Sequence, residues 1–201
     1  MAFLISDLKK AINIMLHPGE ATKETMNVKE ALKFYYKVGL LPFLIFLIVG
    51  LMESIIIGWN YHVVAGVIFG SMVFIVFLSY LVIIPLGLLV QAGLFHLIIG
   101  KLFSMYKGSF NLPFTAYVYG TVPFLLVPLA LVLIILFGFA LALIIIIMII
   151  MTVWSLIVSI IAMANQLGMS KTKAFAVMLL NGFIVSFISA IASSLLSLLA
   201  L

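Results

Sequence analysis

The sequence contains no cysteine and no arginine, and only fifteen of its 201 residues are charged, as ten lysines and five acids. Without cysteine there is no disulfide framework, no cysteine-ligated zinc site and no thiol nucleophile. Charged residues make up 7% of the chain, whereas soluble domains carry about 25% because their surfaces must be solvated. The composition therefore excludes a soluble globular domain.

Long apolar runs take the place of the missing charge. The chain is 67% hydrophobic, with a mean hydropathy of +1.48, and several uncharged runs exceed the roughly 18 residues that span a bilayer. These features predict an all-α, polytopic membrane helical bundle. The net charge of +5 comes from lysines beside the apolar runs. That position favours contact with lipid headgroups and argues against a nucleic-acid partner.

Residues 1–37 form a charged amino-terminal segment that holds ten of the fifteen charged residues. The pattern predicts a short amphipathic helix at the membrane interface, which Pro18 and Gly19 then end. Asn27 and Glu30 resemble a capping box that starts the next helix. The predicted apolar face of the first helix consists of Phe3, Leu4, Leu8, Ala11, Ile12 and Met15.

Three lysines follow this cap at four-residue intervals. Lys29, Lys33 and Lys37 share one helical face just before the first apolar run. They form either a solvated face leading into the membrane or a site for anionic lipid headgroups.

The rest of the chain, residues 38–201, predicts a transmembrane domain with five crossings. The uncertain part is the uncharged stretch from Val63 to the residue before Lys101, which is long for one crossing and short for two. We expect one long tilted helix, kinked at Pro85. The predicted crossings are approximately 38–58, 71–100, 113–137, 139–163 and 174–199.

Charge distribution supports this count. With one crossing in that stretch, the amino-terminal lysines and Lys101, Lys107, Lys171 and Lys173 all fall on the same side, as the positive-inside rule requires. The amino terminus is then cytosolic and the carboxyl terminus outside.

A few polar residues interrupt the apolar runs. They are Glu53, Gln91, His96 and Asn181. A charge at the bilayer centre costs about 2.5–3.5 kcal/mol or more, so Glu53 either has a function or lies near the outer interface. We expect Gln91, His96 and Asn181 to form interhelical hydrogen bonds or, alternatively, to line a transport path.

No pattern in the chain points to catalysis. The histidines at 17, 62 and 96 share no helical face, so no metal site is expected. No glycine-rich phosphate loop and no paired carboxylates occur. We expect a protein that is not an enzyme and has no catalytic residue and no cofactor.

Small residues and prolines predict how the helices pack. Gly66 and Gly70 make a Gly-x-x-x-Gly spacing that lets helix backbones approach closely. In the last helix Gly182, Ser186 and Ser193 belong to a seam of small residues, which we interpret as an internal packing face or a homo-oligomer interface. Pro113, Pro123 and Pro128 are expected to kink the third crossing. The seam also includes Ser189, Ala190 and Ser197.

The stretch "GKLFSMYKGSFNLPFTAYVYGTVPF" resembles the membrane domain of the Yip family, named for Ypt/Rab-interacting proteins. The resemblance rests on Gly108, Phe110, Tyr117 and Pro123, and the later stretch "MTVWSLIVSIIAMANQLGMSKTKAFAVMLL" is similar to the family's fourth crossing and the loop after it. It implies five crossings with a cytosolic amino terminus. The short chain, free of cysteine and arginine, looks like a prokaryotic member in the cell membrane.

The resemblance also bears on function. Eukaryotic relatives are linked to Rab GTPases, vesicle traffic and membrane shaping, and they carry an Asp-Leu-Tyr-Gly-Pro-like motif that this sequence lacks. We therefore expect a non-enzymatic scaffold that organises the membrane or docks a cytosolic protein, with the bilayer, a second copy or another membrane protein as partners. The alternative is a permease for a small solute, an ion or a lipid.

Overall fold

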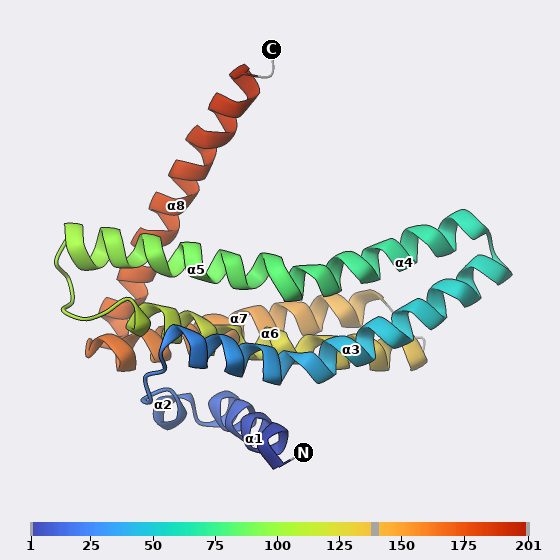
Figure 1. Ribbon diagram of the computed structural model, residues 1–201, viewed down its shortest axis with the longest axis horizontal. Coiled ribbons are helices and arrows are strands. Elements are labelled where there is room, and N and C mark those ends of the chain that lie inside the picture. Colours follow the sequence, from blue (N-terminus) through green and yellow to red (C-terminus); the bar gives the residue numbers. More distant parts are fainter. Residues whose placement is uncertain (1, 138–140, 200–201) are drawn as a thin grey trace.

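The computed structural model describes residues 2–137 and 141–199, with side chains described for 6–133, 143–187 and 190. Its regular structure over these ranges is helical (Figure 1). The predicted boundary between the third and fourth crossings, at residue 138, lies outside the described residues. The elements, with η for π-helical turns, are α1 (Ala2–Leu16), α2 (Pro18–Ala21), α3 (Val28–Asn60), α4 (Val63–Leu78), η1 (Ser79–Ile83), α5 (Ile84–Phe95), η2 (His96–Leu102), α6 (Asn111–Phe137), α7 (Leu141–Leu167) and α8 (Lys171–Leu199).

Helices α3, α6 and α7 form the centre of the bundle, and the long helix from α4 to η2 lies along one side (Figure 1). The short helices α1 and α2 cover the opposite side near the start of α3. Helix α8 rises away from the bundle on the side of α5, so its carboxyl end lies far from α1.

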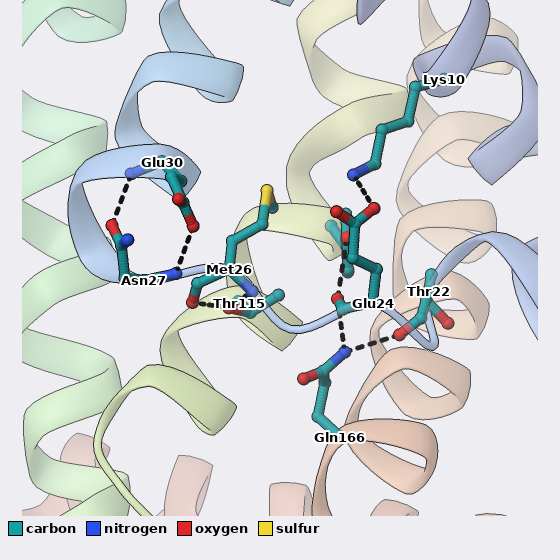
Figure 2. Close-up of polar contacts among 9 residues, drawn as sticks. Lys10, Thr22, Glu24, Met26, Asn27, Glu30, Thr115 and Gln166 are labelled. Carbon is teal, nitrogen blue, oxygen red and sulfur yellow. Dashed lines mark hydrogen bonds and ion pairs between the residues drawn. The ribbon is translucent and has the colours of Figure 1, made fainter.

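Helix α3 begins where the sequence predicts. The Asn27 side chain accepts a hydrogen bond from the Glu30 backbone N–H, and the Glu30 carboxylate accepts one from the Asn27 N–H (Figure 2). The capping box is thus confirmed. The helix comprises 33 residues without a break at residue 38, so residues 28–37 of the charged segment and the first apolar run form one rod about 50 Å long.

The stretch that posed the crossing question is one continuous helical segment of 40 residues, Val63–Leu102, as expected. A π-turn, η1, precedes Pro85, and the helix changes direction between α4 and α5 (Figure 1). Pro85 lacks an N–H, so one carbonyl in the preceding turn has no helical donor. The hydroxyls of Tyr35 and Tyr36 on α3 donate to the carbonyls of Tyr80 and Leu81 in this turn, at 2.9 and 2.8 Å.

Close helix contacts form at glycines along the α3–α4 hairpin. A Cβ on Gly66 would lie within 3 Å of backbone atoms of Ser54 and Gly58, and one on Gly70 would lie 3.0 Å from the Ser54 hydroxyl. The Gly-x-x-x-Gly spacing therefore lies against α3 of the same chain, near the turn between the two helices.

The amphipathic face of α1 differs from the one predicted. Ala11 and Ile14 are fully buried against the bundle, whereas Ile12 is half exposed. The sequence pattern placed Ile12 on the buried face and left out Ile14, because it assumed a flat interface. The packing is instead set by α3, α6 and α7, which α1 contacts.

The small-residue seam of α8 also departs from the internal packing role predicted for it. A Cβ on Gly182 would meet open space, and Ser186 is exposed. The reason is that α8 leaves the bundle beyond Asn181 (Figure 1). The side chain of Ser193 lies outside the described residues.

Four helices in the described part of the chain are long and apolar enough to cross a membrane: Val28–Asn60, Val63–Leu102, Asn111–Leu133 and Leu143–Leu167. Helix α8 has 29 residues but is not among them. The count of five crossings therefore stays a prediction.

Candidate functional site

The amino-terminal segment is fixed to the bundle by its own backbone. Residues 22–26, which we call the strap, pass over the ends of α6 and α7 (Figure 2). The alternate carbonyls at 22, 24 and 26 face the bundle and accept hydrogen bonds from side chains there. Gln166 Nε2 donates to the carbonyl oxygens of Thr22 and Glu24, at 2.7 and 2.9 Å.

Helix α6 supplies the other contacts to the strap. The Thr115 hydroxyl accepts from the Met26 N–H at 3.2 Å and donates to the Met26 carbonyl at 2.8 Å. The Tyr119 hydroxyl donates to the Glu24 carbonyl at 3.0 Å. Thr115 and Tyr119 are four residues apart and so share one helical face. Together with Gln166 they form a receptor that holds the strap by its main chain.

Polar residues of α7 bind the segment on either side. Asn165 Nδ2 donates to the Gly19 carbonyl at 3.0 Å and to the Thr22 hydroxyl at 2.8 Å. Trp154 Nε1 donates to the Met15 carbonyl at the end of α1. Gln166 is only 7% exposed, because the strap covers it.

Two ion pairs hold α1 against the rest of the segment. Lys10 pairs with Glu24 at 2.5 Å, and Lys37 on α3 pairs with Asp7 at 2.7 Å. Burial alone would lower the pKa of Lys10, but the hydrogen bond and charge of Glu24, together with Tyr119, raise it above its ordinary value. Lys10 therefore stays protonated at physiological pH.

These charges border a groove of about 300 Å³ between α1, the strap and α3. We call it the mixed-charge groove. Of the three lysines predicted to meet lipid headgroups, it includes Lys33 and Lys37 but not Lys29. Its lining residues are Asp7, Lys10, Glu24, Met26, Glu30, Lys33, Phe34 and Lys37.

A second polar group lies between α5, α6 and α8. Asn181 Nδ2 donates to the Tyr117 hydroxyl at 3.2 Å, and the exposed side chain of Gln91 lies near that hydroxyl. Asn181 is 1% exposed, and its Oδ1 has no hydrogen-bond partner among the described residues. His96 Nδ1 lies 2.7 Å from the hydroxyl of Tyr106. Burial raises the pKa of Tyr106 to about 12, so that hydroxyl is neutral. These five residues form the polar cluster.

The polar cluster brings together three of the four polar residues that the sequence singles out. The fourth, Glu53, lies near the turn between α3 and α4, at the other end of the long helix. No group of three or more histidine, cysteine or acidic side chains suitable for a metal occurs within the part of the chain that the structure describes.

The residues that carry the family resemblance surround the polar cluster. Tyr117 belongs to it, and the Phe110 ring contacts His96 and stacks on Phe114. Gly108 lies in the connection before α6, where a Cβ would collide with the Leu112 side chain. Pro123 is inside α6.

Long apolar helices around a partly buried polar cluster, with most charged residues gathered away from the α3–α4 turn, define an integral membrane protein of the helical class. A model of the Yip1 domain matches residues 12–198 of the 201, and the chain belongs to that family. No curated protein and no solved structure matches the chain.

Sequence reasoning missed most of the strap receptor. The four-residue spacing of Thr115 and Tyr119 was the available signal. Gln166 gave none, since its partners are backbone carbonyls more than 140 residues away. The contact of Tyr80 with Tyr35, which is stacked, and with Tyr36, which is edge-on, was missed because the partners lie about 45 residues apart.

Proposed function

We propose that this chain is a non-enzymatic membrane-organising protein, with its amino-terminal segment in the cytosol and its carboxyl terminus outside. The observation that carries the proposal is the length of the Val63–Leu102 helix. Forty apolar-rich residues extend about 60 Å, whereas the hydrocarbon core is about 30 Å thick. To keep its whole length inside the hydrocarbon core, a straight helix would have to tilt by about 60° from the bilayer normal, beyond the usual upper limit of about 40°.

A mismatch of this size acts on the bilayer. An overlong apolar helix is accommodated by tilting, by bending or by local thickening of the membrane. The π-turn before Pro85 provides a bend, but the tyrosine hydroxyls of α3 lock it in one shape. The protein therefore presents a rigid, overlong apolar surface that the lipids have to follow.

The direction of α8 adds to this effect. The axis of α8 points away from the axis of α4. The two helices therefore lie further apart with distance from the end of the bundle where α8 begins (Figure 1). Large apolar side chains are exposed on both, among them Phe183 at 74% and Met72 at 60%. Lipids would fill the space between the helices, so the protein has different cross-sections in the two leaflets.

The cytosolic platform of α1, α2 and the strap supports a related docking role for a soluble protein. It is held in one place by main-chain contacts and presents exposed charges such as Lys9, Glu20 and Lys23. Cross-linking through the cytosolic lysines in native membranes, followed by mass spectrometry, tests for such a partner and for a second copy of the chain.

Transport is the second candidate, and the polar cluster is the observation in its favour. Against it, Asn181 and Phe95 are almost completely buried, and Glu53 lies outside the polar cluster, in α3 near the turn to α4. We therefore prefer the organising role.

The deciding experiment is electron cryomicroscopy of vesicles that contain the purified full-length chain, prepared with short, medium and long acyl chains. We expect local thickening or bending of the bilayer at the protein, strongest in the short-chain lipid, and none in protein-free vesicles. Unchanged thickness and curvature in all three lipids would reject the organising role. Solute flux that fails on His96→Ala, while the chain still inserts, would favour the permease.

A further inference from the structure

The mixed-charge groove lies beside the start of the first apolar run of α3. It is bordered by Lys37, and the first apolar run begins at the next residue, Val38, which is fully buried. Charged residues on one side and an apolar run on the other mark the boundary of the hydrocarbon core. At this boundary the headgroup region of a cytosolic-leaflet phospholipid begins.

The groove has matched numbers of charges, with three lysines and three acids among its lining residues. Two lysines already have carboxylate partners, Lys10 with Glu24 and Lys37 with Asp7 (Figure 2 shows the first pair). Lys33 is exposed and has no ion pair within 4 Å among the residues described. It is therefore a cation next to carboxylates, with its hydrogen-bonding capacity unused.

The floor of the groove is apolar. Phe34 and Met26 line it, and each is about 5% exposed or less. A ligand that fits must combine a negative group for Lys33, a positive group for the carboxylates and an apolar part for the floor.

We propose that this groove binds the headgroup of phosphatidylethanolamine from the cytosolic leaflet. The Lys33 ammonium binds the phosphodiester, as lysine commonly does. The primary ammonium of the lipid donates hydrogen bonds to the carboxylates of Glu24 and Glu30, whose oxygens also accept from Lys10 and from the Asn27 N–H. The glycerol backbone lies on the apolar floor.

The same chemistry selects against other common phospholipids. The trimethylammonium of phosphatidylcholine has no N–H to donate. Phosphatidylglycerol has no cation, and its net negative charge would face three carboxylates. A surface that only attracts negative lipid through its lysines would show the opposite preference and bind phosphatidylglycerol most tightly.

The test is native mass spectrometry of the full-length chain in detergent containing equal amounts of the three phospholipids with identical acyl chains. We expect one phosphatidylethanolamine retained in preference to the other two. Lys33→Gln should reduce its retention about fivefold, the effect of one lysine near a membrane surface. Lys29→Gln is the matched control, since it makes the same charge change on the same helix outside the groove. Both side chains are exposed, so both variants should fold.

Three outcomes would overturn the proposal. They are equal retention of phosphatidylethanolamine and phosphatidylcholine, preference for phosphatidylglycerol, and an equal loss in Lys29→Gln and Lys33→Gln. Added glycerophosphoethanolamine distinguishes the source of the headgroup. If the water-soluble compound displaces the lipid at equal concentration, the floor contributes nothing and the lipid assignment fails. None of these results depends on whether the protein bends membranes.

Discussion

Replacing Gln166 with leucine should release the strap while leaving the bundle intact. Leucine keeps much of the buried volume but removes two hydrogen bonds to the carbonyls of Thr22 and Glu24 and one from the Thr25 hydroxyl. Each is worth about 1 kcal/mol net. Thr25 is exposed, so its hydroxyl can bond to water instead. The two bonds to the strap carbonyls then set an expected loss of about 2 kcal/mol in the free energy that holds the strap closed.

Hydrogen exchange of the amides at residues 22–27 measures this loss directly. Local opening controls their exchange, and about 2 kcal/mol corresponds to roughly 30-fold faster exchange. The amides of α6 around Val118 should keep their protection. The matched control is Thr152→Val on the same helix, because the Thr152 hydroxyl bonds only within α7, to the Met148 carbonyl. If exchange at 22–27 rises less than about threefold in Gln166→Leu, the receptor does not hold the strap.

Three further predictions concern packing, charge and topology. Gly66→Val should cost about 2 kcal/mol or more, because its side chain meets α3 backbone. That would lower the Tm in detergent by at least about 4 °C, while Gly182→Val, in open space, should leave it unchanged. Because the folded-state pKa of Lys10 is raised above 10.5, its stabilisation of α1 is complete below pH 10.5 and lost as pH rises through the folded-state value. Trp154 emission should show that transition in the native chain but not in Lys10→Met. Finally, Ser104→Cys should resist an impermeant thiol reagent in intact cells, and labelling there would reject five crossings with a cytosolic amino terminus.

The elements that sequence reasoning found are those that depend on neighbours in the chain. The capping box at Asn27 and Glu30 is local, and it is correct. The single helix from Val63 to Leu102 follows from an uninterrupted apolar run and from the requirement to keep lysines on one side, and it too is confirmed as a continuous helix. Hydropathy and local spacing contain this information without any knowledge of how the helices pack.

The elements that it missed depend on which helices meet. Pro85 signals a kink, but nothing near it shows that Tyr35 and Tyr36, 45 residues away, supply the missing donors. The apolar face of α1 was shifted from Ile14 to Ile12 because a helix on a flat bilayer and a helix against three others bury different stripes. The open side of Gly182 was missed because small-residue spacing does not say whether a partner is present.

The polar cluster shows how far burial can be inferred from sequence in a membrane protein. Polar residues in apolar runs are expected to seek each other, because hydrocarbon offers them no partner, and Asn181 does find one in Tyr117. Glu53 lies outside the polar cluster, in α3 near the turn to α4. The rule predicts that an isolated polar residue needs a partner or an interface, but the choice between them is made by the fold. Asn181 retains one buried oxygen without a donor in the described part of the chain, so replacing it with leucine should cost less than Tyr117→Phe, which would leave an amide donor unpaired in the same apolar surroundings.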